Sequence, residues 1–225
     1  MNIEENFSDS FEYTKKLFSQ FRTLILLIVL DIIPIVDWIV LGYAARVLKD
    51  PPDDKTPPKI EKYRELSKEG TKVFVVSMVY LIVPAILIGA GVASFITAHI
   101  IGGASAPEAT GGVLFFGATS LLLLLVGVVA AFLALIVLGA AIAHMIKQDS
   151  FGKAFAFGEI FGVIREIGWR KYLVWVLMVA IIGFVVAAIA GAIPLVGWLI
   201  QIVIFPAVAV FFFRSLGLLY SERKK

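Results

Sequence analysis

Long runs of hydrophobic residues dominate the chain and predict helices that lie in a membrane. Residues 74–146 contain one formally charged residue, Glu108, and residues 172–213 contain none. Apolar runs of this length cannot be covered by water-facing side chains, so we expect them to lie in lipid or against other helices. They predict two helical hairpins, over residues 73–146 and 171–220.

A third, shorter hairpin is expected over residues 23–48. Each of its arms holds roughly 12 to 14 residues, a helix of about 18–21 Å against a hydrocarbon thickness of ~30 Å. This hairpin therefore either enters the bilayer partway or recruits the amphipathic turns that precede it. The alternative interpretation is one kinked span over residues 24–48.

One eight-residue motif occurs near both ends of the chain and marks the expected bends. The sequence reads IPIVDWIV at residues 33–40 and IPLVGWLI at residues 193–200. Proline stops or kinks a helix, because its ring removes one backbone hydrogen bond and clashes with the preceding turn. We therefore expect bends at Pro34 and Pro194, with Asp37 as a candidate N-cap of the helix that restarts after the first bend.

A short amphipathic stretch precedes each hairpin. These stretches cover residues 7–22, 59–70 and 150–168, and the spacing of their apolar residues predicts helices that lie in the membrane interface. Residues 61–74 also align without gaps on residues 159–172. The matching Glu, Gly and basic positions favour three degenerate copies of one unit over chance similarity between apolar segments.

Composition agrees with a membrane protein rather than a soluble domain. The chain is 60% hydrophobic and 16% charged, with a mean hydropathy of +0.96, whereas about 25% of the residues in a globular chain are charged. We therefore expect one all-α transmembrane domain over residues 1–225, a polytopic fold of about six membrane helices in three hairpin units. The absence of cysteine excludes disulfides and thiolate metal sites.

Lysine and arginine are distributed unevenly and predict an orientation. They gather in residues 49–72, in residues 147–171 and at the C-terminal tail, whereas the loop at 102–112 has none. The positive-inside rule places the basic segments in the cytoplasm. With six segments both termini are cytoplasmic, in the cell (inner or plasma) membrane. A single span over residues 24–48 would instead place the N-terminus outside.

Two blocks near the third hairpin carry a family resemblance. The chain reads AFAFGEI at residues 154–160 and IGWRKYL at residues 167–173. Together with residues 33–36 and 41–47, these blocks make the chain similar to an uncharacterised prokaryotic, largely archaeal, multi-pass membrane family that is catalogued as a domain of unknown function. The resemblance spans nearly the whole chain and implies a polytopic fold. It implies no activity and assigns no catalytic residue.

Three polar residues within apolar segments are the first candidates for function. Asp31 and Asp37 flank the first bend, and intramembrane carboxylates often mark ion or proton pathways. The alternative is that Asp37 caps a helix and Asp31 faces water, which we favour because the second copy of the bend has Gly197 in place of Asp37. Gln201 is expected to hydrogen-bond a neighbouring helix.

Two arginines and three tryptophans are candidate interfacial anchors. Arg46 and Arg214 each lie near the expected cytoplasmic end of a helix, where a long cationic side chain reaches towards lipid phosphates. The alternative is that they pair with Glu159 or Glu166. The tryptophans sit at the expected ends of membrane helices, where indole rings prefer the interface: Trp38, Trp169 and Trp198.

No motif in the sequence indicates catalysis or a cofactor. With no cysteine and no carboxylate cluster nearby, His99 and His144 are expected to be interfacial or to make core hydrogen bonds rather than to bind a metal. We expect a non-enzymatic, channel or transporter-like membrane protein, or alternatively a membrane scaffold that organises lipids. The expected partners are the lipid bilayer and further copies of the chain, without nucleic acid; the sequence identifies no small-molecule or ion substrate.

Overall fold

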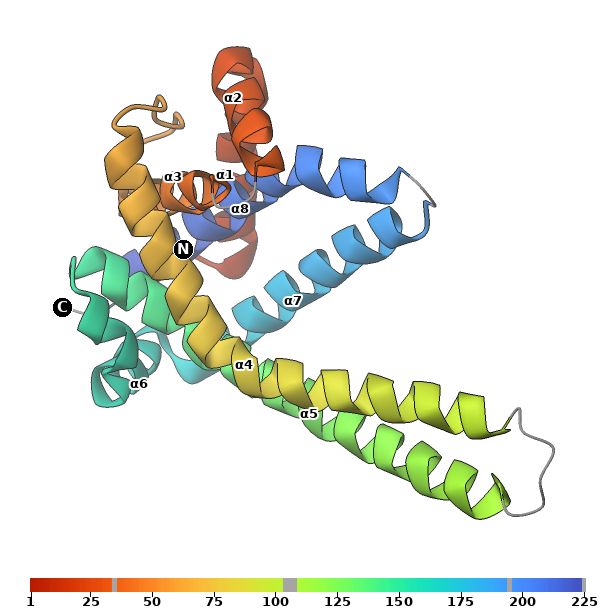
Figure 1. Cartoon of the computed structure of the whole chain (residues 1–225). Helices are drawn as coiled ribbons and strands as arrows, with labels where there is room; N and C mark the ends of the chain where they lie inside the picture. Colours follow the sequence, from red (N-terminus) through yellow and green to blue (C-terminus); the bar gives the residue numbers. More distant parts are fainter. Residues whose placement is uncertain (34–35, 103–108, 194–195, 224–225) are drawn as a thin grey trace. The chain divides into compact units, whose positions relative to one another are not determined.

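The computed structural model describes residues 1–33, 36–102, 109–193 and 196–223, without the side chains of residues 101, 102, 109 and 110, and this part of the chain is almost entirely helical (Figure 1). The expected bend residues Pro34 and Pro194 lie outside the described residues. The elements in chain order are α1 (Ile3–Ser19), α2 (Phe21–Ile32), α3 (Trp38–Lys49), α4 (Tyr63–Gly102), α5 (Ala109–Lys147), the 3₁₀ helix η1 (Phe151–Phe155), α6 (Phe157–Ile167), α7 (Trp169–Gly191) and α8 (Gly197–Ser221).

Four of the described helices are long and apolar enough to cross a membrane. They cover Tyr63–Ile100, Gly111–Lys147, Trp169–Gly191 and Gly197–Ser221, with mean hydropathies between 2.2 and 3.3. Even the shortest, at 23 residues, extends about 35 Å, which exceeds the ~30 Å of hydrocarbon. The expected six spans in three hairpin units are not confirmed.

The difference from six spans lies in the first hairpin. The α2 and α3 helices have 12 residues each, so each is only about 18 Å long and too short to span the hydrocarbon. The expected amphipathic stretch at 59–70 also differs, because from Tyr63 onwards it forms the first turns of α4. Gly70 and Thr71 lower helix propensity by about 1 kcal/mol or less each, which is too little to end a helix that packing supports.

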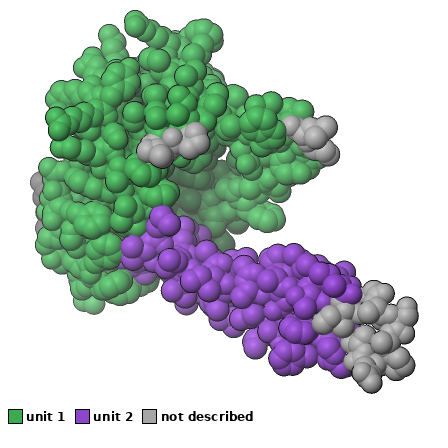
Figure 2. Space-filling view, in the orientation of Figure 1, with its two compact units in different colours: residues 1–76, 138–225 green, residues 77–137 purple. Residues whose placement is uncertain are grey.

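The chain divides into two compact units (Figure 2). Unit 1 comprises residues 1–76 and 138–225, and unit 2 comprises residues 77–137. Within unit 1, α8 is the central helix and packs against α1, α2, α3 and α7. The second half of α8, from Pro206 to Tyr220, contains most of its buried residues.

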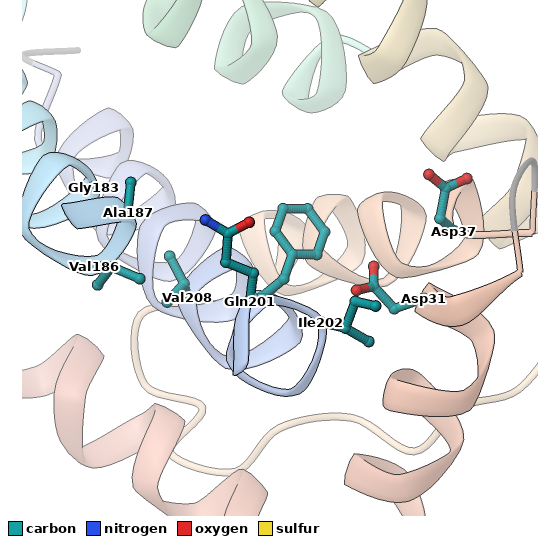
Figure 3. A pocket seen from close by; sticks show the side chains of 9 residues that line it. Asp31, Asp37, Gly183, Val186, Ala187, Gln201, Ile202 and Val208 are labelled. Carbon is teal, nitrogen blue, oxygen red and sulfur yellow. The ribbon is translucent and has the colours of Figure 1, made fainter. Parts of the chain in front are cut away.

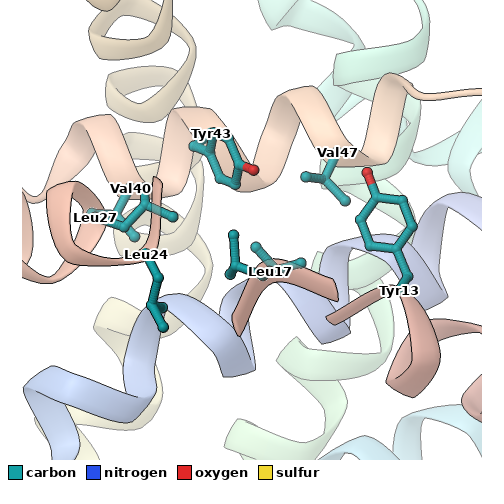
Figure 4. Packing of buried hydrophobic residues seen from close by; sticks show 8 residues of the cluster. Tyr13, Leu17, Leu24, Leu27, Val40, Tyr43 and Val47 are labelled. Atoms are coloured by element: carbon teal, nitrogen blue, oxygen red, sulfur yellow. The ribbon is translucent and has the colours of Figure 1, made fainter. Parts of the chain in front are cut away.

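A buried hydrophobic cluster joins the first three helices to α8 (Figure 4). Its residues recur every three or four positions, which places them on one face of each helix. They are Tyr13, Leu17, Leu24, Leu27, Val40, Tyr43, Val47 and Val210. Because the cluster draws on α1, α2, α3 and α8, the N-terminal fifth of the chain is held on the C-terminal helix.

Glycines let α3 and the first turns of α4 approach each other at backbone distance. A Cβ atom placed on Gly42 would lie 1.8 Å from the carbonyl oxygen of Leu66, and one placed on Gly70 would lie 1.6 Å from that of Trp38. No other residue fits at either position while the two backbones keep this separation.

Unit 2 consists of parts of α4 and α5, which also pack through glycine. A Cβ atom on Gly91 would lie 2.9 Å from Cγ of Leu124, and one on Gly127 would lie 2.7 Å from Cγ1 of Ile88. Small residues at such contacts are typical of membrane helices, because lipid provides little hydrophobic drive for helices to associate. Large apolar side chains such as Leu121 face outwards and are exposed.

Candidate functional site

Three polar residues from apolar parts of unit 1 line one pocket (Figure 3). Asp31 lies in the last turn of α2, Asp37 directly precedes α3, and Gln201 lies in the second turn of α8. The pocket has a volume of about 430 Å³, within the roughly 300–1,000 Å³ of small-molecule sites. The three polar residues singled out in the sequence are therefore brought together at a single site.

The remainder of the pocket wall is apolar. Its residues come from α7 and α8: Gly183, Val186, Ala187, Ile202, Phe205 and Val208. In Figure 3 the two carboxylates lie on the side of α2 and α3, and α7 forms the opposite side. The pocket thus has an acidic end and a largely hydrocarbon surface elsewhere.

Asp37 occupies the N-cap position of α3, but its side chain makes no capping hydrogen bond. Its backbone already has helical angles, with φ −50° and ψ −28°, whereas a capping residue normally has an extended backbone that turns its side chain onto the free N–H groups. The expectation that Asp37 caps the restarted helix is therefore wrong. Its Oδ1 atom is instead buried without a hydrogen-bond partner among the described residues.

Gln201 is exposed at the pocket rather than buried against a neighbouring helix. The helix contact expected for its amide is thus not what the structure shows. An exposed amide on an apolar helix presents both a hydrogen-bond donor and an acceptor to whatever enters the pocket.

Arg214 is buried beneath residues that follow α3. Only 1% of it is exposed, and its guanidinium donates to the carbonyl oxygens of Pro51 (3.0 Å), Pro52 (2.8 Å) and Asp54 (2.7 Å). Its carboxylate partner is Asp9 at 3.3 Å, not Glu159 or Glu166. Arg214 therefore attaches the linker between α3 and α4, residues 50–62, to α8.

The other anchor candidates lie at helix contacts or on the surface. Arg46 is half-buried and donates to the carbonyl oxygen of Glu61 at 3.3 Å. Trp38 stacks on Phe74 with ring centroids 5.0 Å apart. Trp169 and Trp198 are 43% and 60% exposed. That these side chains anchor the protein in a membrane interface stays a prediction.

A buried histidine joins three helices at the end of α5. His144 Nε2 donates to Oε2 of Glu159 on α6 at 2.7 Å, and its Nδ1 hydrogen-bonds the hydroxyl of Tyr220 on α8 at 2.9 Å. The core hydrogen bond that was one expectation for His144 is confirmed. Lys153 donates to both carboxylate oxygens of Glu159, and the hydrogen bonds from Lys153 and then His144 hold the pKa of Glu159 below its usual range.

The residues that carry the family resemblance thus have structural contacts. Glu159 of the AFAFGEI block holds His144. Gly168 of the second block links α6 to α7 with φ +100°, a conformation that residues with a side chain rarely adopt. Tyr172, also of that block, is fully buried, and its hydroxyl accepts the backbone N–H of Ala140 at 2.9 Å.

Two further polar clusters on α1 were not predicted. The side chains of Asn6 and Ser215 hydrogen-bond each other, and Trp175 Nε1 donates to the Ser215 hydroxyl at 2.7 Å. The polar residues Asn6, Ser10 and Thr14 recur every four positions, a spacing that could have indicated a buried polar face on α1.

The second cluster joins α1 to the end of α3. Tyr13 donates to Oδ2 of Asp50 at 2.7 Å. Burial raises the pKa of Asp50, and the hydrogen bond from Tyr13 acts in the opposite direction. Because the guanidinium of Arg214 lies 4.5 Å from the centre of the Tyr13 ring, the same tyrosine contacts both the linker and α8.

Among the side chains that the structure describes, no group of three or more His, Asp or Glu residues is placed to hold a metal ion. No curated protein and no solved structure matched the chain. A family model described as "Protein of unknown function (DUF4013)" matches residues 25–195, a segment that begins within α2, extends past the end of α7 and contains both blocks of the resemblance. The chain belongs to this DUF4013 family.

Proposed function

We propose that this protein is a non-enzymatic channel or transporter-like membrane protein whose solute passes through or binds in the pocket of Asp31, Asp37 and Gln201. The observation that carries the proposal is the convergence of these residues on one pocket with an otherwise apolar wall. Polar side chains are costly in an apolar setting and tend to mark pathways for ions or polar solutes.

Interrupted helices next to the pocket support this proposal. The α2 helix ends at Ile32 and α3 begins at Trp38, so both carboxylates lie beside a break between helices. Transporters commonly place their binding sites at such breaks, because helix ends present backbone groups that intact helices do not.

We further propose that the protein resides in the cell membrane with both termini in the cytoplasm. The four apolar helices support membrane insertion, and the lysine- and arginine-rich segments at 49–72 and 147–171 support their cytoplasmic placement. The proposed partners are the bilayer and further copies of the chain, without nucleic acid. We expect the same arrangement across a largely archaeal family.

The test is a flux measurement with the full chain in liposomes. Gradients of H⁺, Na⁺, K⁺ and a small organic cation are imposed in turn, and the decay of each is followed. We expect wild-type protein to accelerate at least one decay and the double variant Asp31→Asn/Asp37→Asn to abolish that acceleration. Asp53→Asn is the matched control, because Asp53 is exposed in the linker away from the pocket.

A membrane scaffold that organises lipids is the second candidate. It is favoured by the exposed aromatic side chains of the amphipathic helices, such as Phe11 and Phe18 on α1, which are 64% and 57% exposed. Rings exposed in this way suit the headgroup region of a bilayer. Flux equal to that of empty liposomes for every gradient would refute transport and favour the scaffold.

A further inference from the structure

Resting on the proposed function, we propose that the pocket of Asp31, Asp37 and Gln201 takes a substituted ammonium group, that is, an organic cation with an apolar portion. The argument uses the charge of the pocket, its size and the chemistry of its wall. The pocket lies entirely within unit 1 and is lined by described residues.

The charge of the pocket is negative and is not compensated by its own lining. Two of the lining residues are aspartates, and none of those that the structure describes there is Lys, Arg or His. Oδ1 of Asp37 is buried without a hydrogen-bond partner among the described residues. A buried carboxylate in that state is costly unless a positive charge lies close by, and an organic ammonium ion in the pocket supplies that charge.

The size of the pocket favours an organic cation over a bare inorganic ion. A volume of about 430 Å³ is more than ten times the ~30 Å³ that one water molecule occupies in the liquid. A dehydrated cation such as Ca²⁺ needs about six to eight oxygen ligands, whereas the side chains here offer two carboxylates and one amide. The pocket therefore fits a larger ion with fewer polar contacts.

The apolar wall of the pocket suits the hydrocarbon substituents of such an ammonium ion. Val186, Ala187 and Val208 present hydrocarbon, and the aromatic ring of Phe205 belongs to the same lining. An aromatic face attracts substituted ammonium groups, and an apolar wall buries their alkyl substituents. The acidic end then receives the charged nitrogen and the α7 side receives the substituents.

Gly183 provides a way to fill the pocket without altering its charge. It lines the pocket from α7, and a Cβ atom added to it would meet no other atom within 4 Å. The Cβ atom of a valine at this position would thus enter open space, and its two methyl groups should reduce the pocket volume. Gly183→Val is the steric variant, and Asp37→Asn is the charge variant of identical shape.

Substituted ammonium groups occur both in soluble amines and in lipid headgroups, so the experiment has two arms. In the first arm, the full chain in nanodiscs of phosphatidylglycerol is titrated with benzyltrimethylammonium, and with benzyl alcohol as the uncharged counterpart. In the second arm, thermal unfolding is compared between nanodiscs with and without phosphatidylethanolamine. Each arm uses the wild type, Asp37→Asn, Gly183→Val and the control Asp53→Asn.

The expected result is saturable binding of benzyltrimethylammonium but not of benzyl alcohol, or specific stabilisation by phosphatidylethanolamine. Removing one charge-assisted contact should weaken binding by about 10- to 100-fold in Asp37→Asn, and Gly183→Val should weaken it without changing charge. Asp53→Asn should behave as wild type. The size-exclusion profile of each variant separates lost binding from lost folding.

Three results overturn the inference, and they differ in what they leave standing. If Na⁺, K⁺ or H⁺ flux depends on Asp31 and Asp37 while neither ammonium source binds, the inference fails and the proposed function stands. If no ammonium binds and no gradient decays faster with protein than without it, both fail. Binding that persists unchanged in both Asp37→Asn and Gly183→Val also refutes the inference, because the ligand would then sit elsewhere.

Discussion

Replacing Arg214 with methionine should loosen the linker between α3 and α4 while leaving most helices formed. Methionine keeps much of the side-chain length but donates no hydrogen bonds. The change removes three donors to the carbonyl oxygens of Pro51, Pro52 and Asp54 and the ion pair to Asp9. Asp9 keeps a second cationic partner, Lys55, so its charge is not left unpaired.

The magnitude follows from the contacts that are lost. A hydrogen bond to a charged donor contributes roughly 1.5–3 kcal/mol, so three of them set an upper limit of about 5–9 kcal/mol. Pro51, Pro52 and Asp54 are exposed residues, and their carbonyl groups can turn to water once the linker moves. We therefore expect about half of the limit at most, ~2–4 kcal/mol. Arg214→Lys should lose less, because its ammonium keeps the charge but cannot reach three carbonyl groups in a fork.

The assay is chemical unfolding in mixed micelles combined with limited trypsin digestion at Lys55, which lies in the linker. If the linker must open before it is cleaved, ~2–4 kcal/mol corresponds to a cleavage rate about 30- to 1,000-fold higher. Arg165→Met is the control, since Arg165 is exposed on α6 and its loss should change stability by less than about 0.5 kcal/mol. Cleavage of Arg214→Met at the wild-type rate, with unchanged unfolding, would refute this account of Arg214.

Three further changes test other contacts. Gly70→Ala should destabilise unit 1 by about 1–3 kcal/mol or more in micelle unfolding, because its Cβ would lie 1.6 Å from the Trp38 carbonyl oxygen. The control Gly89→Ala should be close to neutral, since a Cβ there would have no atom within 4 Å. Equal effects of the two changes would contradict the close approach of α3 and α4. Tyr172→Phe should cost about 1–3 kcal/mol by removing the buried acceptor of a backbone N–H, and unchanged unfolding would show that the hydroxyl is dispensable. The pKa of Glu159 in the folded state is lowered, so its carboxylate stabilises the fold fully above the ordinary pKa of about 4.3, and this stabilisation is lost as pH falls through the lower folded-state pKa. The difference in melting temperature between wild type and Glu159→Gln should therefore shrink in that acidic range. A difference that stays constant with pH would contradict the ionic contact.

The positions of the long helices could be predicted from the sequence because they depend on local hydrophobicity. The outer ends of α7 and α8 match those of the segment expected at 171–220 to within two residues, and α4 and α5 extend beyond both ends of the segment expected at 73–146. The number of spans could not be predicted in the same way. Whether a 12-residue apolar arm such as α2 crosses a membrane depends on what covers it, and here α8 and the cluster around Leu27 do so.

The surroundings of the polar residues were harder to predict than the positions of the helices. Arg214 follows a long apolar run, a pattern that in sequence resembles a cation at the end of a membrane helix. Arg214 is buried by α1 and by residues 50–54 of the linker, which belong to the N-terminal part of the chain. Contacts between residues more than 150 positions apart leave no periodic signal in either segment.

The two copies of the motif, at residues 33–40 and 193–200, show how a difference between repeats can lead to a wrong inference about function. The sequence has Gly197 where the first copy has Asp37, and this difference suggested that the carboxylate was dispensable. A Cβ atom on Gly197 would lie 1.8 Å from the carbonyl oxygen of Ala190, so the close packing of α7 and α8 excludes any side chain there. The glycine therefore reflects a steric requirement at the start of α8 and provides no evidence against a role for Asp37. Asp37 instead lines a pocket, and a carboxylate that does not cap its helix needs another reason to be there.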